Sequence, residues 1–220
     1  MEKKKEAAKK GIGLFGGTFN PIHLGHLRGA EEIRETFGLQ EVIFIPAAHP
    51  PHKVTEEIIE AHHRLEMVKR ATRKNPQFST SDVELKRGGK SYSVDTIRYF
   101  LEKLKDSLYF ILGRDAFMEI ETWKDFHNLF SLCNFIVMAR PGFIQASPLP
   151  EVLAPAFRYD QGVSAWVHAS GNIVFFKEIN FLDISSTKVR ELAQKGGSLK
   201  YLVPPEVEAY IAKHGLYRRR

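Results

Sequence analysis

The segment Gly16-Gly17-Thr18-Phe19-Asn20-Pro21-Ile22-His23-Leu24-Gly25-His26 joins an apolar run to a helical pattern. The run Gly11–Gly16 predicts a buried first strand. Apolar residues at 24, 27, 30, 33 and 37 predict a helix over His23–Phe37 that ends at Gly38. In an open α/β sheet, ligands bind beyond the carboxyl ends of the strands, and this segment leaves the first such end. The order of strand, glycine loop and helix therefore predicts a ligand site at residues 16–26.

The composition of this segment favours a phosphate group as the ligand. Gly16 and Gly17 let backbone amides approach an anion, because no Cβ intervenes, and the next helix directs unpaired N–H groups to the same place. His23 and His26 are expected on one side of the first helical turn, with Gly25 keeping the helix surface low between them. Walker, G-x-G-x-x-G and HExxH patterns are absent. Two imidazoles suit a phosphoryl group under transfer, although either histidine could be an ordinary surface residue of the helix.

Strand and helix patterns alternate along the rest of the chain. Strands are expected at Val42–Pro46, Phe78–Leu85, Leu108–Gly113, Phe135–Ala139 and Ile173–Ile179. Helices are expected at Ile58–Arg73, Ser93–Leu104, Trp123–Phe130, Ser186–Lys195 and Pro205–His214. A loop is expected at Ala47–Thr55. Residues 143–170 show no regular hydrophobic period, so loop with at most one short helix is expected there. This alternation predicts an α/β fold with a doubly wound parallel sheet and a small C-terminal helical part.

Charge and composition narrow the classes of function. The formal net charge is +6, but residues 1–10 carry five lysines and two glutamates and residues 218–220 are three arginines, so residues 11–217 are neutral overall. We expect two basic tails around a single domain over residues 11–217. Nucleic-acid-binding proteins carry positive charge on a folded face, so no nucleic-acid partner is expected. No apolar run approaches the ~20 residues of a membrane span.

Cellular location follows from the same kind of observation. The first residues are charged, which is unlike a secretory signal, and the single cysteine, Cys133, lies in a buried-strand pattern. We expect Cys133 to be a small core residue and the protein to be cytoplasmic. The sequence is compatible with both a monomer and a homo-oligomer.

A second candidate site lies at Ile184-Ser185-Ser186-Thr187-Lys188-Val189-Arg190. Ser186 or Thr187 is expected to be the N-cap of a helix, with Arg190 one turn into it. A helix N-terminus with hydroxyl groups and an arginine is suited to the β and γ phosphates of ATP.

Together the two segments resemble the GxFxPxHxGH and ISSTxxR signatures of the nucleotidyltransferase superfamily, which includes the HIGH-type class I aminoacyl-tRNA synthetases. The stretch between them resembles bacterial nicotinate-nucleotide adenylyltransferases. The landmarks are Pro50-Pro51-His52-Lys53, His63-Arg64, Ser91-Tyr92-Ser93-Val94-Asp95-Thr96, Gly113-Arg114-Asp115, Trp123 and Arg140-Pro141-Gly142. Three positions depart from the common pattern: Asn20 stands where many members have Asp, Ser93 where many have Thr, and Arg114 where a small or amide residue is frequent.

The resemblance implies a Rossmann-like fold and adenylyl transfer from ATP to nicotinate mononucleotide in NAD biosynthesis, which gives deamido-NAD and pyrophosphate. It implies Mg²⁺ as the cofactor, held mainly through the ATP phosphates rather than by metal-binding residues. The implied catalytic residues are His23, His26, Lys53 and Arg190. The implied ATP-binding residues are Gly16, Gly17, Thr18, Phe19, Gly25, Gly113, Asp115, Ile184, Ser185, Ser186 and Thr187. The implied acceptor-binding residues are Asn20, Tyr92, Ser93 and Trp123, with Trp123 stacked on the pyridine ring.

Several of these residues have a second interpretation. Lys53 could be an ordinary loop lysine, Arg64 is as compatible with a helix salt bridge as with a ligand contact, and Asp115 could accept from ribose hydroxyls or cap a helix. Trp123 could be a core aromatic residue. For the whole chain, a sister enzyme with another acceptor, such as phosphopantetheine or a cytidylyltransferase substrate, and a basic nucleic-acid-binding module are the alternatives.

The sequence also suggests how the carboxylate of the acceptor is bound. Lys and Arg are scarce around Tyr92-Ser93 and Trp123, so we expect backbone N–H groups and a helix end to bind the carboxylate. A neutral amide would leave hydrogen bonds unmade, so the acid is expected to be preferred over the amide.

Overall fold

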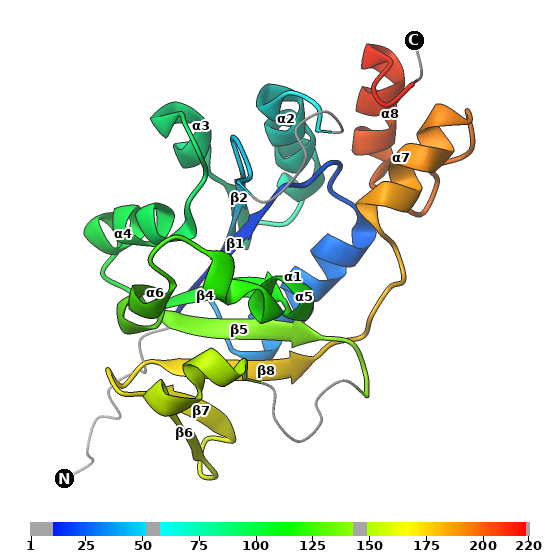
Figure 1. Cartoon of the computed structure of the whole chain (residues 1–220). Helices are drawn as coiled ribbons and strands as arrows, with labels where there is room; N and C mark the ends of the chain where they lie inside the picture. The colour runs from blue at the N-terminus through cyan, green and yellow to red at the C-terminus, as the bar shows by residue number, and fades with distance from the viewer. Residues whose placement is uncertain (1–10, 52–57, 143–148, 219–220) are drawn as a thin grey trace, which may run out of the picture.

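The computed structural model describes residues 11–51, 58–142 and 149–218, and an eight-stranded sheet forms its centre (Figure 1). The strands are β1 (Ile12–Gly17), β2 (Glu41–Pro46), β3 (Phe78–Thr80), β4 (Leu108–Gly113), β5 (Asn134–Ala139), β6 (Phe157–Asp160), β7 (Ala165–His168) and β8 (Ile173–Glu178). Their order in the sheet is β3-β2-β1-β4-β5-β8-β7-β6. All pairs from β3 to β8 are parallel, and β7 and β6 add an antiparallel edge. The order from β3 to β5 is that of a dinucleotide-binding sheet, and the predicted doubly wound fold is confirmed.

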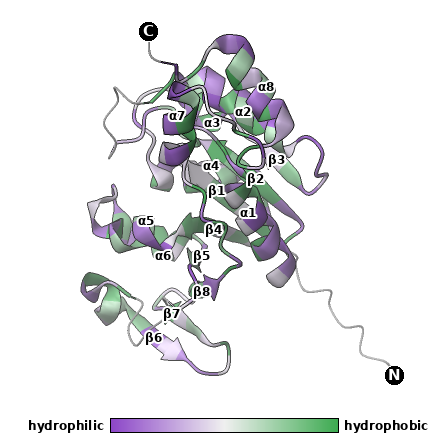
Figure 2. Ribbon diagram, turned by 90° about the vertical axis from the view of Figure 1, so that its right-hand side faces the viewer, coloured by the Kyte–Doolittle hydropathy of each residue, from purple (hydrophilic) through white to green (hydrophobic). Residues whose placement is uncertain are grey.

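Helices cover both faces of the sheet. They are α1 (Leu24–Thr36), α2 (Ala61–Thr72), α3 (Val83–Arg87), α4 (Ser93–Lys103), α5 (Arg114–Met118), α6 (Phe126–Leu132), α7 (Ser186–Gln194) and α8 (Pro205–His214), with short 3₁₀ turns at η2 (Ile120–Thr122) and η3 (Glu151–Ala156). In Figure 2 these helices carry both hydrophobic and hydrophilic residues, as expected of helices with one buried side. Figure 1 shows α2, α7 and α8 gathered at one end of the molecule and β6, β7 and β8 at the other.

Alternation along the strands divides the interior into two cores. Leu14 on β1 packs in one core with α4 and α6, through residues such as Ile97 and Phe130. Phe15, the next residue, packs in the other core with α1 and α8. Because successive strand residues point to opposite faces, a continuous apolar strand needs helices on both sides. This requirement places the C-terminal helices α7 and α8 on the same face as α1 and α2.

The prediction of loop with one short helix over residues 143–170 missed two strands. From residue 149 onward it contains η3 and the strands β6 and β7, and β7 pairs with β8. Residues 143–148 lie outside the described part of the chain. Each of these strands has four residues, too few to display a period. The edge of β8 pairs with β7, and β7 in turn pairs with β6, so these pairings supply the backbone hydrogen bonds of the two strands.

Three further element boundaries differ from the prediction by three residues or more. The helix expected to begin at Ile58 begins at Ala61. The strand expected over Phe78–Leu85 stops at Thr80. The Ser81 N–H makes the last hydrogen bond to β2, at Phe44 O, and the chain then turns into α3, where Val83 joins the core. The helix expected over Trp123–Phe130 begins only at Phe126, which leaves Trp123 in a turn before it.

Cys133 is buried, and burial raises the pKa of its thiol to about 12, which confirms it as a core residue. Within residues 11–51, 58–142 and 149–218, no helix is both long enough and apolar enough to cross a membrane.

Candidate active site

Three adjoining cavities lie at the carboxyl ends of the parallel strands. The Trp123 cavity, of about 250 Å³, is lined by Gly17, Tyr92, Ser93 and Trp123. The His26 cavity, of about 690 Å³, is lined by Gly17, His26, Thr187 and Arg190. The Arg140 cavity, of about 680 Å³, is lined by His26, Asp115, Arg140 and Thr187. Gly113, at the end of β4, lines all three, so together they form one continuous groove.

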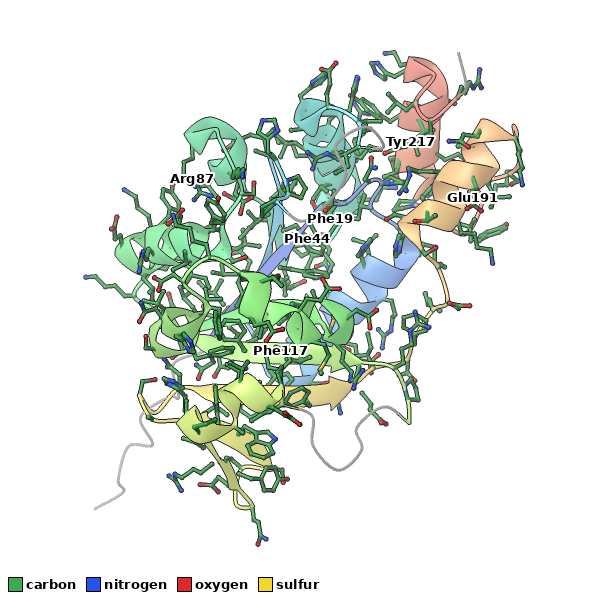
Figure 3. All side chains as sticks on the ribbon, viewed as in Figure 1. Phe19, Phe44, Arg87, Phe117, Glu191 and Tyr217 are labelled. Carbon is green, nitrogen blue, oxygen red and sulfur yellow. The ribbon has the colours of Figure 1, made fainter. Side chains whose placement is uncertain are left out.

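The glycine loop is shaped by the ring of Phe19. Phe19 adopts a positive φ of 47° and its buried ring packs edge-on against Phe15 and beside Phe44; Figure 3 shows Phe19 and Phe44 next to each other. A Cβ on Gly17 would lie 2.9 Å from that ring. Gly17 is therefore required by packing against Phe19, whereas the sequence suggested approach of a ligand as the reason.

The two histidines lie together, as predicted. Their rings are stacked with centroids 3.6 Å apart, and both line the Arg140 cavity. The backbone N–H of His23, the N-cap of α1, donates to Nδ1 of His26 at 3.2 Å. Since Nδ1 of His26 accepts, the neutral ring carries its proton on Nε2, which makes Nε2–H a donor.

His23 differs from His26 in its environment. It is 6% exposed, and its Nδ1 has no hydrogen-bond partner among the described residues. Burial lowers the pKa of His23 to about 4, so this ring is neutral near pH 7. Gly25 makes room here, because a Cβ would lie 3.1 Å from His23 Nδ1 and 3.3 Å from the Leu182 carbonyl.

The second segment closes on the first, although they are far apart in the sequence. Ser186 Oγ donates to the Pro21 carbonyl at 2.8 Å, and Arg190 Nη1 donates to the Asn20 carbonyl at 3.1 Å. The N-cap of α7 is Ser185, whose Oγ accepts from the Lys188 N–H at 3.2 Å. The expectation of Ser186 or Thr187 as the cap was wrong, and their hydroxyl groups face the loop and the cavities instead.

Arg64 has neither of the roles considered for it. Its side chain is 1% exposed, and its guanidinium donates to four carbonyls, at distances from 2.6 to 3.0 Å. These carbonyls belong to Ile59, Thr18, Ala47 and Ala48. Burial lowers the pKa of Arg64 to about 10, so it remains charged at neutral pH. Arg64 is thus a structural cation that joins the loops after β1 and β2.

Asn20 is also held within the protein. It is buried, and its Oδ1 accepts from the Tyr217 hydroxyl at 3.0 Å and from the Ile59 N–H at 3.4 Å. Burial raises the pKa of Tyr217, so its hydroxyl keeps the proton that it donates. Asn20 lines the His26 cavity, but acceptor binding by this residue stays a prediction. No local pattern in the sequence distinguished Tyr217.

The Trp123 cavity contains charged side chains that the sequence reading missed. Lys124 lines it, with Nζ 4.6 Å from the centre of the Tyr92 ring and 3.1 Å from an oxygen of Asp95. The expectation that lysine and arginine are scarce around Tyr92, Ser93 and Trp123 thus overlooked Lys124, and binding of the carboxylate by backbone N–H groups stays a prediction. Lys124 follows Trp123 directly, so adjacency was the available signal.

Glu84 is a further lining residue of the Trp123 cavity that the sequence reading missed. It is buried, and its Oε1 accepts from the Thr96 hydroxyl at 2.7 Å. Burial raises the pKa of this carboxyl group above its ordinary value. Trp123 packs edge-on against Phe110, with ring centroids 6.2 Å apart, so it is both a core contact and a lining residue.

The Arg140 cavity is partly aromatic. The Arg140 guanidinium lies 4.2 Å from the centre of the Phe181 ring, and both residues line the cavity. Asp115 lies in the first turn of α5, whose N-cap is Gly113, so the capping alternative for Asp115 was wrong. Phe181 was missed because it follows β8 in an irregular segment.

Every predicted site residue within the described ranges lines at least one of the three cavities. Lys53 lies outside those ranges. In the same ranges, no group of three His, Cys, Asp or Glu side chains could hold a metal ion.

Comparison with known proteins finds relatives over most of this chain. The model of the cytidylyltransferase-like family matches residues 14–192. A protein of Syntrophotalea carbinolica named "Probable nicotinate-nucleotide adenylyltransferase" is 47% identical over 211 residues, covering 94% of this chain and 97% of its own. A protein of the same name from Geobacter metallireducens is 46% identical over 209 residues, covering 93% of this chain and 97% of its own.

Solved structures share the fold. The nicotinic acid mononucleotide adenylyltransferase of Plasmodium falciparum, complexed with NaAD, superposes with a TM-score of 0.72 at 21% identity, covering 94% of this chain and 97% of its own. The same enzyme complexed with APC gives a TM-score of 0.69 at 20% identity, with the same coverage.

Proposed function

Because the chain belongs to the cytidylyltransferase-like family and to the nicotinate-nucleotide adenylyltransferases, we propose that it transfers the adenylyl group of ATP to nicotinate mononucleotide. The products are deamido-NAD and pyrophosphate. The observation that carries this proposal is the continuous groove of three cavities with His26 and Arg190 at its middle. A dinucleotide has the same order of parts: one nucleoside, bridging phosphates and a second nucleoside.

Each cavity is assigned to one part of the reactants. The Trp123 cavity takes the pyridine nucleoside, because an indole offers a flat apolar face to an aromatic ring. The His26 cavity takes the phosphates, and the Arg140 cavity takes the adenosine of ATP. In this arrangement Ser186, Thr187 and Arg190 bind the β and γ phosphates at the N-terminal end of α7.

The reaction is an in-line displacement at the α-phosphorus of ATP. A phosphate oxygen of the acceptor attacks, the bond to the bridging oxygen breaks, and pyrophosphate leaves on the opposite side. The Nε2–H of His26 donates to an α-phosphate oxygen as charge builds up there, and neutral His23 keeps the His26 ring in place by stacking. Positioning and charge stabilisation therefore supply the rate, and no covalent intermediate is needed.

Magnesium belongs to this proposal through ATP. The polar side chains that line the His26 cavity carry imidazole, hydroxyl, amide and guanidinium groups and no carboxylate among the described residues, whereas Mg²⁺ prefers carboxylate and phosphate oxygens. The ATP oxygens would thus hold the ion, and it would neutralise their charge as pyrophosphate departs.

A pyrophosphate-release assay with ATP and Mg²⁺ tests the proposal, with nicotinate mononucleotide, its amide and phosphopantetheine as separate acceptors. The expected result is turnover with nicotinate mononucleotide above both others. Turnover with phosphopantetheine alone would assign the chain to a sister activity, and no turnover with any acceptor would contradict adenylyl transfer.

A further inference from the structure

The Trp123 cavity has a cationic side chain at its rim, Lys124, which lies immediately after the aromatic residue assigned to the pyridine ring. Among the described residues that line this cavity, Lys124 is the one lysine or arginine. Its side chain is 47% exposed, so it borders solvent rather than the protein interior. Lys124 thus places a positive charge at the solvent-facing side of the cavity assigned to the pyridine nucleoside.

Lys124 is held in that position by two neighbours. Its Nζ lies 3.1 and 3.5 Å from the two carboxylate oxygens of Asp95, and it lies 4.6 Å from the centre of the Tyr92 ring. An adjacent ion pair, Arg98 with Asp125 at 3.0 Å, ties the same helix, α4, to the residue after Lys124. Two ion pairs and a cation–π contact therefore fix this lysine beside the cavity.

The ammonium group retains capacity for a ligand. It has three N–H donors, and the Asp95 carboxylate accepts from it. A second carboxylate could therefore be bound without loss of the first pair. Nicotinate mononucleotide and its amide differ only in that one carries a carboxylate and the other a neutral carboxamide on the ring.

We propose that Lys124 is a specificity-determining residue that favours an acceptor with a ring carboxylate over one with a ring carboxamide. The Asp95 carboxylate positions Lys124 and also weakens its attraction for a second anion. This inference rests on the proposed function, since it concerns the acceptor of that reaction. It adds a side-chain cation to whatever the backbone N–H groups contribute.

The experiment compares kcat/KM for nicotinate mononucleotide and for its amide in Lys124→Met, Lys124→Glu and Asp95→Asn variants at saturating ATP and Mg²⁺. Methionine keeps the length and apolar stem of lysine. It should lower the acid-to-amide ratio about 2- to 5-fold, the upper part of the range for an exposed ion pair. Glutamate should lower the ratio by roughly the square of that factor, because repulsion replaces attraction. Asp95→Asn should raise the ratio, because a nearby negative charge is removed.

The separate values of KM and kcat give a second readout of the role of Lys124. The ring carboxylate is remote from the reacting phosphorus, so the change should appear in KM for the acid and leave kcat nearly unchanged. The acid-to-amide ratio of the unmodified protein should also fall as salt is added, and that of Lys124→Met should not. Lys86→Met is the matched control, since Lys86 is an exposed lysine paired with Asp82 at the same distance of 3.1 Å and does not line the Trp123 cavity.

The outcomes separate this inference from the function on which it rests. If the unmodified protein releases pyrophosphate with nicotinate mononucleotide and Lys124→Met keeps its acid-to-amide ratio, the role of Lys124 is contradicted and the function stands. If the unmodified protein has no activity with either acceptor, the proposed function itself fails. Equal loss with both acceptors in Lys124→Met would show a general packing role and would also overturn the inference.

Discussion

The hydrogen bond from the His23 N–H determines which ring nitrogen of neutral His26 can donate to a phosphate. The Nδ1 of His26 accepts from the His23 N–H at 3.2 Å, which leaves Nε2–H as the donor in the neutral ring. Replacing His26 with Ala should lower kcat about 10²-fold, the usual effect of removing one preorganised donor, with a small change in KM for ATP. Steady-state kinetics at saturating acceptor measures this. His127→Ala, at an exposed position of α6, is the control, and wild-type turnover in His26→Ala would make His26 a structural residue.

His23 makes stability depend on pH. Its pKa is lowered to about 4 by burial, whereas in the unfolded chain it is near 6.5. Between these values the unfolded state binds a proton that the folded state does not, so the folded state loses stability as pH falls. The loss is about 1.4 kcal/mol per pH unit below 6.5 and reaches about 3 kcal/mol near pH 4, while above 6.5 the effect is absent.

Urea unfolding of the unmodified protein and of His23→Gln from pH 7.5 to pH 5 checks this, because glutamine cannot titrate. The difference in unfolding free energy between the two should narrow as pH falls below about 6.5. A pH-independent difference would mean that His23 has the same pKa in the folded and unfolded states, which would contradict the lowered pKa. His127→Gln serves as the control for loss of an exposed histidine.

At the scale of elements, α2 is joined to two strand ends by a single side chain. Arg64 donates to carbonyls that follow β1 and β2, and α2 contributes Met67 and Val68 to the core beneath. Replacing Arg64 with Ala should lower the free energy of unfolding by more than about 3 kcal/mol, because buried carbonyls lose their donors. Lysine should recover only part, since it lacks the planar fork that reaches several carbonyls at once.

Arg73→Lys is the matched control at the opposite end of α2, where the side chain is exposed and pairs with Glu206 at 3.7 Å. It should change the unfolding free energy by less than about 0.5 kcal/mol. Chemical denaturation at neutral pH measures all three variants. Full stability in Arg64→Lys would show that charge alone, rather than the geometry of the guanidinium, holds the loops.

At the scale of the whole molecule, the C-terminal segment completes the loop after β1. The Tyr217 hydroxyl donates to Asn20 Oδ1, and the Leu202 carbonyl accepts from the Leu24 N–H at 2.9 Å. Tyr217→Phe removes one donor from a buried amide oxygen, which should lower the unfolding free energy by about 1–3 kcal/mol. Because Asn20 also positions Arg190 through its carbonyl, KM for ATP should rise. Tyr201→Phe, at a tyrosine that is 86% exposed, should change neither quantity.

The sequence by itself determined the parallel sheet, the helices on both of its faces and the two signature segments at one edge. These features follow from local causes: apolar periods of two and of about 3.6 residues, and glycines followed by a helix start. Each of these patterns is visible within about a dozen residues of sequence, because the backbone geometry of a strand or helix sets the spacing of its buried side chains. The predicted site residues that the structure describes met at one groove for the same reason, since the carboxyl ends of parallel strands share an edge.

Only the tertiary structure decided the features that depend on partners distant in the chain. Arg64 became a structural cation because four carbonyls surround it, and β7 and β6 formed because β8 offered an edge to β7 and β7 to β6. Tyr217 reached Asn20 across nearly the whole chain, and Lys124 came to border the Trp123 cavity because Asp95 and Tyr92 of another segment hold it. Hydrogen bonds and burial between remote residues leave no period in the sequence, so the folded arrangement is what assigns these side chains their roles.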